Sequence, residues 1–367
     1  MRQTCVARRR FAVPHFFLRG RFPSKVFPKA EETPGRTVRC LLRCSLFVVA
    51  WLTLAGPARC SQESPDSPAG AIRVRVNMVS VGVVVTDGQG KFVEGLQTED
   101  FHVLDDGVEQ PTRYFALDQP SHVLLLIEAG PAVYLLEGGH VHAANALLAG
   151  LSAGDEVAVV KYAESPEAIC DFNADKQIAA GALEHLNFNL GFGALNLSES
   201  LARVLDWLDK TTGKKTVVLL SSGVDTSPPG TTAGLLQRLR VGDVRVLAVS
   251  LAGEMRTPVA SRKKQRPSSP AATVSAEQFA AADEELRGLS AASGGRVYFP
   301  ANAKEFDAAY AEIAQIVRHE YSLGFAPVAL DGKVHRIQVR MRAQGAEVSG
   351  WRVDHRWGYT AMDGNQR

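Results

Sequence analysis

Hydrophobic and polar residues alternate along the chain from residue 72 to residue 118. The stretch "IRVRVNMVSVGVVVTD" alternates as expected of an antiparallel strand with one face in a core. The turn sequence "DGQG" follows it, and "FHVLDDGVEQPTRYFAL" predicts two more strands around Asp106 and Gly107. Because this stretch contains no long helical pattern, residues 72–118 are predicted to form a small β module.

Beyond residue 121, continuous apolar stretches alternate with segments of helical spacing. This alternation predicts a mostly parallel sheet that is covered by helices on both faces. Ser198 is predicted to be an N-cap, because its hydroxyl group can accept a hydrogen bond from the first turn of a helix. The strands are predicted at 123–128, 155–163, 169–173, 215–223, 244–251 and 294–299, and the helices near 137–150, 174–186, 198–210, 231–240, 276–292 and 303–319.

The α/β pattern occupies residues 121–320 and is interrupted once. A polar, basic segment at 255–275 is predicted to be a solvated, mobile loop, because it lacks the apolar residues that a packed element needs. After residue 320 the sequence returns to short strand patterns. Residues 321–361 are therefore predicted to form a β tail that packs beside the β module.

Residues 1–60 form a basic leader with a hydrophobic end. Residues 45–56 are 12 uncharged, mostly apolar residues, which suits a signal peptide better than a membrane span of about 20 residues. A polar linker at 61–71 follows, which disfavours a buried helix of the fold. Export to the periplasm, the envelope or the exterior is therefore expected. The basic region is long for a signal peptide, so either translation starts downstream or a cytoplasmic extension precedes a short membrane tether. Arg59 before Cys60 disfavours a lipoprotein.

Charge and cysteine content separate the leader from the body. Of 41 Lys and Arg and 39 Asp and Glu, the first 60 residues hold 12 and 2, which leaves 29 and 37 for the rest. A mildly acidic body disfavours nucleic acid as a partner. Of the five cysteines only Cys170 lies in the body, so no disulfide can form there, and it is interpreted as a small core residue.

Three parts of the chain resemble one family. They are "VVVTDGQGKFVEGLQTEDFHVLDDGVEQPTRYF" at 83–115, the α/β body, and residues 289–361 with "LSAASGGRVYF" and "YSLGFAP". Together they resemble the VWFA-related secreted proteins of the Acidobacteria type, whose body is a von Willebrand factor type A domain. The resemblance covers nearly everything after residue 71. It implies a three-layer, doubly wound, mostly parallel α/β fold with an N-terminal β module and a C-terminal β tail.

The resemblance also implies a position for a divalent cation, the metal-ion-dependent adhesion site at the top of the sheet. The family pattern is Asp-x-Ser-x-Ser after the first strand, a Thr before the third helix and an Asp after the fourth strand, all hard oxygen ligands. In this chain only the first and last of the five positions keep a side-chain oxygen, and neither matches the original group. The adhesion site is therefore predicted to be degenerate and to hold no metal or other cofactor. The five positions are Glu128, Gly130, Ala132, Gly193 and Ser222.

Three interpretations of this edge of the sheet are weighed. In the first, the edge is a structural relic in which Glu128 is solvated or paired with a local cation. In the second, a metal-free surface binds a protein partner. In the third, Glu128 acts as the acid of an enzyme. The second is favoured, and its candidate contact residues are Pro131, Tyr134, Phe188, Phe192 and Asp225.

An enzyme is not predicted. "GFGALN" does not follow a strand inside a βαβ unit, and neither G-x-x-x-x-G-K-[ST] nor H-E-x-x-H occurs. "SSGVD" lacks the G-x-S-x-G spacing of a nucleophile elbow. The predicted function is an exported, non-enzymatic interaction or scaffolding module. The alternatives are a metal-dependent adhesion module with other ligands and, less favoured, a hydrolase that uses Glu128.

Overall fold

The computed structural model describes residues 78–117, 119–130, 139–186, 193–252, 276–343 and 346–362. The chain divides into two units after residue 71, and all of the described residues belong to the second, Ile72–Arg367. The predicted leader, the linker and the polar insert at 255–275 lie outside the described residues. No helix in the described ranges is both long and apolar enough to cross a membrane.

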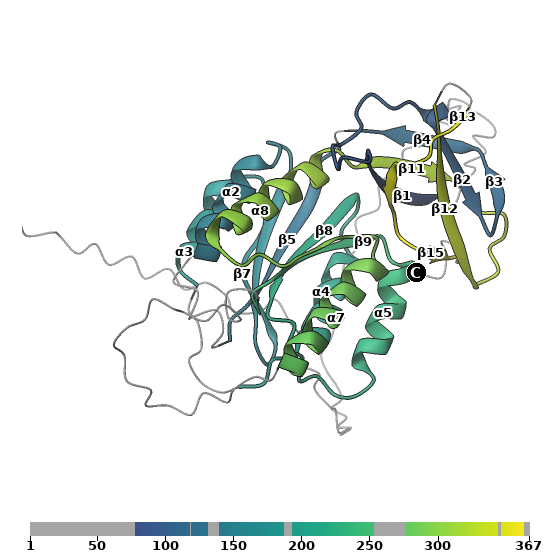
Figure 1. Ribbon diagram of the computed structural model, residues 1–367. Helices are drawn as coiled ribbons and strands as arrows, with labels where there is room; N and C mark the ends of the chain where they lie inside the picture. Colours follow the sequence, from purple (N-terminus) through teal and green to yellow (C-terminus); the bar gives the residue numbers. More distant parts are fainter. Residues whose placement is uncertain are drawn as a thin grey trace, which may run out of the picture. The chain divides into compact units, whose positions relative to one another are not determined.

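A six-stranded sheet forms the centre of the α/β body (Figure 1), and its strand order is β10-β9-β8-β5-β6-β7. The first five strands run parallel, and β7 is an antiparallel edge strand with an irregular register against β6. This is the mostly parallel, doubly wound sheet that the sequence predicts. The strands are β5 (Ser121–Glu128), β6 (Glu156–Tyr162), β7 (Pro166–Asn173), β8 (Lys214–Ser221), β9 (Val244–Ser250) and β10 (Val297–Tyr298).

Helices cover both faces of this sheet, as Figure 1 shows. Along β5 the side chains alternate between two apolar cores, with Val123, Leu125 and Ile127 in one and Leu124 and Leu126 in the other. The residues of β8 and β9 are all buried, which explains why these strands read as continuous apolar runs. The first core is closed by α2 (Gly139–Gly150), α3 (Lys176–Glu184) and α8 (Ala303–Arg318), and the second by α4 (Leu197–Leu208), α5 (Thr231–Val241) and α7 (Ala276–Ala292).

The β module and the β tail of the sequence analysis share two sheets. One sheet has the order β14-β1-β11-β4, and the other has the order β13-β12-β2-β3 with β15 added beside β12. Each sheet mixes strands from both ends of the chain, and a single apolar core lies between them. The strands are β1 (Val79–Thr86), β2 (Phe101–Asp105), β3 (Val108–Gln110), β4 (Thr112–Ala116), β11 (Tyr321–Phe325), β12 (Val334–Ala343), β13 (Ala346–Glu347), β14 (Arg352–Asp354) and β15 (Gly358–Thr360), with a short 3₁₀ helix at Thr98–Asp100.

The prediction of Ser198 as an N-cap is wrong. Helix α4 begins at Leu197 with Asn196 as its N-cap, and the Asn196 side chain makes no capping hydrogen bond. The backbone N–H of Ser198 donates instead to Asp225 Oδ2, at 3.1 Å. The cap is thus supplied by a carboxylate 27 residues downstream, which a local pattern cannot reveal.

The two sheets that the β module and the β tail share form a β-sandwich. A buried ion pair joins the sheet of the α/β body to this β-sandwich. Arg245, at the start of β9, donates to Glu320 Oε1 from Nε (3.1 Å) and from Nη2 (2.9 Å). Both side chains are less than 10 % exposed. Arg245 also donates to the carbonyl oxygen of Gly82 in β1, at 3.1 Å. A Cβ atom at Gly82 would collide with the Glu320 carboxylate, so the approach requires glycine.

We expect Arg245→Met to lower the free energy of unfolding by about 3–5 kcal/mol, because it leaves a buried carboxylate without its main partner. The nearest remaining cation is Lys214, with Nζ 3.9 Å from Glu320 Oε2. Urea denaturation at neutral pH measures the loss. Arg203→Met is the matched control, because the Arg203–Glu199 pair is exposed and lies within one helix, where such a pair is worth about 0.3–0.5 kcal/mol. Equal losses in the two variants would contradict the assignment.

Candidate functional site

The predicted site lies where β5 and β8 end, at the carboxyl edge of the sheet. Glu128 is the last residue of β5, and Ser222 directly follows β8. The two strands are neighbours, with Ile127 opposite Leu220, so the register places both side chains at the same edge. Glu128 is 0 % exposed and Ser222 is 1 % exposed. The structure therefore brings together the two predicted positions that keep a side-chain oxygen, and it buries both.

One oxygen of the Glu128 carboxylate receives all of its hydrogen bonds. Oε2 accepts from the backbone N–H of Ser222 at 2.7 Å and from its hydroxyl group at 2.8 Å. The hydroxyl groups of Tyr162 and Ser221 each lie 3.3 Å from the same oxygen, and they are 2.7 Å from each other. The N–H and the hydroxyl group of Ser222 occupy the two lone pairs of this oxygen, and the hydrogen-bonded pair of Tyr162 and Ser221 hydroxyl groups lies against it.

The other oxygen, Oε1, is buried and has no hydrogen-bond partner among the described residues. It lies beside Gly130, where a Cβ atom would be 3.4 Å from Oε1 and 2.8 Å from Leu195 Cδ2. The space in which a longer side chain at position 130 would offer an oxygen is therefore filled by the Leu195 side chain. An apolar group occupies the place of the second expected ligand.

Burial raises the pKa of Glu128, and the hydrogen bonds from Ser222, Ser221 and Tyr162 oppose this shift. The buried carboxylate also acts on Tyr162, whose pKa is raised well above its usual value by burial and by the charge of Glu128. The Tyr162 hydroxyl group therefore stays protonated and serves as a donor. The group of four side chains is a closed hydrogen-bonded cluster at the end of the sheet.

The donor set of this cluster does not fit the cation that the type A fold implies. Magnesium requires near-octahedral oxygen coordination at about 2.0–2.1 Å. Glu128 Oε1 is one available oxygen, whereas Ser222 Oγ already donates to the carboxylate. Gly130 and Gly193 contribute no side-chain oxygen. One carboxylate oxygen beside a leucine side chain does not make such a shell.

The remaining predicted site residues divide into two groups. Asp225 is partly buried, and its carboxylate accepts from the N–H groups of Ser198 (3.1 Å) and Ser227 (2.9 Å). It therefore orders the loop after β8 and caps α4, and its contact with a partner stays a prediction. Gly193 is described, and its Cβ position is 3.7 Å from Glu164 Oε1. The others, Pro131, Ala132, Tyr134, Phe188 and Phe192, lie outside the described residues.

The interpretation of Glu128 as solvated or paired with a local cation is wrong. Its carboxylate is fully buried, and its partners are hydroxyl groups and a backbone N–H. Sequence analysis missed Tyr162 and Ser221 as members of the cluster. Tyr162 could have been found, because it ends β6 and lies directly opposite Glu128 in the parallel register.

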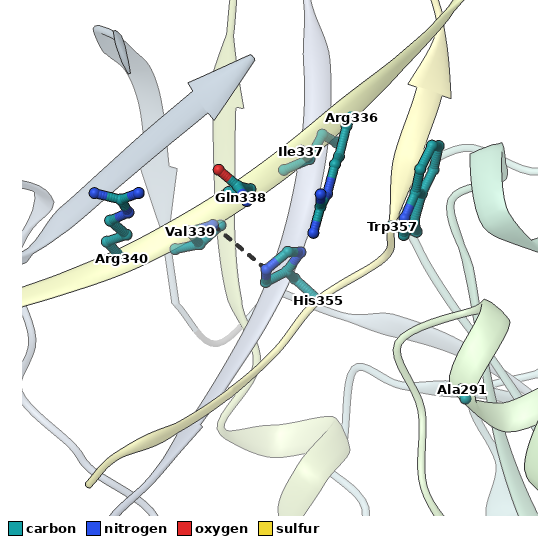
Figure 2. Close-up of a pocket in the computed structure, with 8 residues that line it drawn as sticks. All are labelled: Ala291, Arg336, Ile337, Gln338, Val339, Arg340, His355 and Trp357. Atoms are coloured by element: carbon teal, nitrogen blue, oxygen red, sulfur yellow. Dashed lines mark hydrogen bonds between the residues drawn. The ribbon is translucent and has the colours of Figure 1, made fainter. Parts of the chain in front are cut away.

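A separate cavity of about 370 Å³ lies along β12 and the segment between β14 and β15. Figure 2 shows the Arg336 and Trp357 side chains next to each other among the lining residues, with His355 below Arg336. His355 Nε2 accepts from the N–H of Val339 at 3.4 Å, and Nδ1 lies 2.7 Å from the carbonyl oxygen of Arg356, so both ring nitrogens are engaged. Burial lowers the pKa of His355, which keeps the ring neutral. The lining contains no acid or nucleophile: Ala291, Arg336, Ile337, Gln338, Val339, Arg340, His355 and Trp357.

The sequence matches the family model of the von Willebrand factor type A domain over residues 140–224. The matched stretch contains β6, β7 and β8 and ends just after Ser222, and it begins after Glu128. No curated protein matches the chain. The strand order and this match identify the body as a von Willebrand factor type A-like α/β fold. Domains of this class are in general interaction or adhesion modules.

Several solved structures are similar to parts of the chain at low identity. The conserved hypothetical protein BatB from Bacteroides thetaiotaomicron is 12% identical with a TM-score of 0.40, over 55% of this chain and 100% of that one. An aerotolerance-related membrane protein from Bacteroides fragilis is 13% identical with a TM-score of 0.40, over 54% and 98%. A von Willebrand factor type A protein from Catenulispora acidiphila is 12% identical with a TM-score of 0.42, over 80% and 76%. Likenesses this distant carry no information about function.

We expect Glu128→Gln to change how stability depends on pH. The native state, with its raised Glu128 pKa, still holds the proton at pH values where the unfolded chain, with a pKa of about 4.3, has lost it. The free energy of unfolding of the wild type therefore falls as pH rises above about 4.3, until pH passes the native pKa. The amide cannot titrate, so the variant gains stability relative to the wild type across this window. Urea denaturation at a series of pH values measures the difference.

The matched control is Glu164→Gln, an exposed carboxylate at the same edge of the sheet. The free energy of unfolding of Glu164→Gln should depend on pH in the same way as that of the wild type. Parallel curves for wild type and Glu128→Gln would show that the buried carboxylate keeps an ordinary pKa.

Proposed function

We propose that this protein is an exported, non-enzymatic module that binds a protein partner through the loops at the carboxyl edge of the sheet, without a metal ion. The type A-like fold places its connecting loops at this edge, where open α/β sheets bind ligands. The observation that carries the proposal is that Glu128 is buried and hydrogen-bonded within the protein. Its hydrogen-bonded oxygen is saturated, and its other oxygen lies beside Gly130, where Leu195 fills the space of a longer side chain.

The metal-free part of the proposal is supported by the chemistry of the donors. A metal-dependent adhesion site needs an ion with open coordination positions that a partner's carboxylate can fill. Here the serine that follows β8 donates to Glu128 and is 1 % exposed, so it does not present an oxygen to solvent. In this proposal, recognition depends on the side chains of the predicted contact residues Pro131, Tyr134, Phe188 and Phe192.

The absence of catalysis is likewise proposed from the site's accessibility. A general acid must reach its substrate within hydrogen-bonding distance. Glu128 is completely buried, and its neighbours Tyr162 and Ser221 are 0 % exposed. The cavity beside Trp357 lacks an acid or nucleophile in its lining. The hydrolase alternative therefore has no accessible group to start from at either place.

The binding mode can be tested by immobilising the chain and capturing envelope proteins in Mg²⁺ and in EDTA. We expect the same partner under both conditions, and we expect its capture to fall at least tenfold with Tyr134→Ala combined with Phe192→Ala. Trp357→Ala is the control, because Trp357 is an exposed aromatic residue on the β-sandwich. Capture that EDTA abolishes, and that Glu128→Gln also abolishes, would establish the metal-dependent alternative. Unchanged capture by the double variant would place the binding surface elsewhere.

Export is proposed from the hydrophobic run at 45–56, which follows a basic region and precedes a polar linker. We expect the protein recovered from its native cell to be in the envelope or the medium, with an N-terminus near residue 60 as determined by Edman degradation. An intact N-terminus in the envelope fraction would instead indicate a membrane tether. An intact leader in the cytoplasmic fraction would overturn export.

A further inference from the structure

A second group of carboxylates lies in the β-sandwich, far along the chain from the predicted site. Asp105 ends β2, Asp106 and Gly107 form the turn to β3, and His335 is the second residue of β12. Strands β2 and β12 are antiparallel neighbours with Asp105 opposite Ile337. The Asp106 carboxylate accepts from the N–H of Arg336 at 2.8 Å. The register and this bond place both carboxylates beside the imidazole ring.

The three groups have the spacing of ligands around one ion. His335 Nδ1 lies 2.9 Å from Asp106 Oδ2 and 3.4 Å from Asp105 Oδ1, and all three atoms lie within 4.8 Å of one another. At metal–ligand distances of about 2.0–2.1 Å, neighbouring ligand atoms are about 3.0 Å apart in an octahedral shell and about 3.3 Å apart in a tetrahedral one. The two distances to Nδ1 agree with these values.

A buried oxygen without a hydrogen-bond partner points into this group. Asp105 is 1 % exposed, and no described residue donates a hydrogen bond to its Oδ1. Its other oxygen, Oδ2, accepts from the Tyr359 hydroxyl group at 2.7 Å and lies 3.5 Å from the N–H of Val328. A buried carboxylate oxygen without a donor is unfavourable, because the protein does not replace the water that it has lost. A cation bound at Oδ1 would replace that water.

The imidazole ring is held in the orientation that a metal ligand needs. Nε2 lies 3.1 Å from Asp331 Oδ1, so it can donate its proton there and leave the lone pair of Nδ1 directed at the two carboxylates. The ring also stacks on Tyr359, with centroids 5.3 Å apart and an interplanar angle of 25°. Asp331 thus stands in the position of the outer carboxylate that fixes the tautomer of many metal-bound histidines.

We propose that Asp105 Oδ1, Asp106 Oδ2 and His335 Nδ1 bind one divalent transition-metal ion of the Zn²⁺ class, with water completing its shell. Imidazole together with two carboxylates suits Zn²⁺, Fe²⁺ or Mn²⁺ better than Mg²⁺ or Ca²⁺, which prefer all-oxygen shells. The ion would join the β2–β3 turn of the N-terminal part to β12 of the C-terminal part. Its role would be structural: it would cross-link the two parts of the β-sandwich, because its ligands come from segments more than 200 residues apart.

Protonation of His335 is the alternative to a metal ion at this position. The hydrogen bond to Asp331 raises the pKa of His335, and an imidazolium ion could donate to Asp331 from Nε2 and to Asp106 from Nδ1. That arrangement leaves Asp105 Oδ1 without a hydrogen bond, since it lies farther from Nδ1 than Asp106 does. The unpartnered oxygen is the observation that favours a metal ion over a proton.

The test is Zn²⁺ titration of the chelator-treated, full-length chain at neutral pH by calorimetry, with the melting temperature as a second readout. The wild type should bind one more equivalent of Zn²⁺ than His335→Gln and than Asp106→Asn, and Zn²⁺ should raise the melting temperature of the wild type by several degrees more. The Asp106 side chain is 54% exposed, so its substitution should leave the fold intact. The leader cysteines are identical in all of these chains, so the difference isolates this site.

His102→Gln is the matched control, because His102 faces Glu109 across the same β-hairpin without a second carboxylate. It should bind Zn²⁺ as the wild type does. Asp331→Asn should keep the extra equivalent but weaken it about 10–100-fold, as expected of an outer carboxylate. Equal Zn²⁺ stoichiometry in the wild type, His335→Gln and Asp106→Asn would overturn the proposal and assign the cluster to an imidazolium ion.

Discussion

The Arg245–Glu320 ion pair fixes how the two folded parts of the chain are joined. Arg245 is the second residue of β9, at the amino edge of the parallel sheet, and Glu320 lies between α8 and β11, the first strand that returns to the β-sandwich. The guanidinium group also donates to the Gly82 carbonyl in β1. Because both charges are buried, removing either one deprives the other of its main partner, which is strongly unfavourable. The amino edge of the sheet is therefore occupied by structural contacts, whereas the proposed binding surface lies at the opposite edge.

At the carboxyl edge of the sheet, the buried carboxylate is stabilised by hydrogen bonds and not by an ion pair. A carboxylate in the interior is stabilised either by a counter-ion or by several hydrogen-bond donors. Glu128 has donors alone, from Ser222, Ser221 and Tyr162. The extra methylene of glutamate relative to aspartate places the carboxylate within reach of the neighbouring strand ends, and Leu195 fills the space that remains. The sheet therefore ends in a self-contained polar cluster, and a partner would meet the loops above it.

Much of the α/β body could be predicted from the sequence, because its signals are local. Continuous apolar runs such as those of β8 and β9 predict strands that are buried on both faces. That Gly130 and Gly193 carry no side-chain oxygen is evident from the sequence, whereas their correspondence to ligand positions rests on the family resemblance and stays a prediction. What could not be predicted depends on distant partners. The cap of α4 comes from Asp225, and the β module and β tail share sheets through pairings such as Val81 with Leu323.

Among the buried carboxylates of the described residues, Glu128 and Asp105 each leave one oxygen without a hydrogen bond, and their surroundings lead to opposite conclusions. Oε1 of Glu128 lies beside Gly130, whose Cβ position is filled by the Leu195 side chain, and the described residues place no second ligand next to it. Oδ1 of Asp105 faces an imidazole nitrogen and a second carboxylate, at distances typical of one coordination shell. Both oxygens have lost water, but only the second has neighbours that could replace it together with a cation. If the chain binds a divalent ion, the chemistry of the donors favours the site in the β-sandwich over the carboxyl edge of the type A-like sheet.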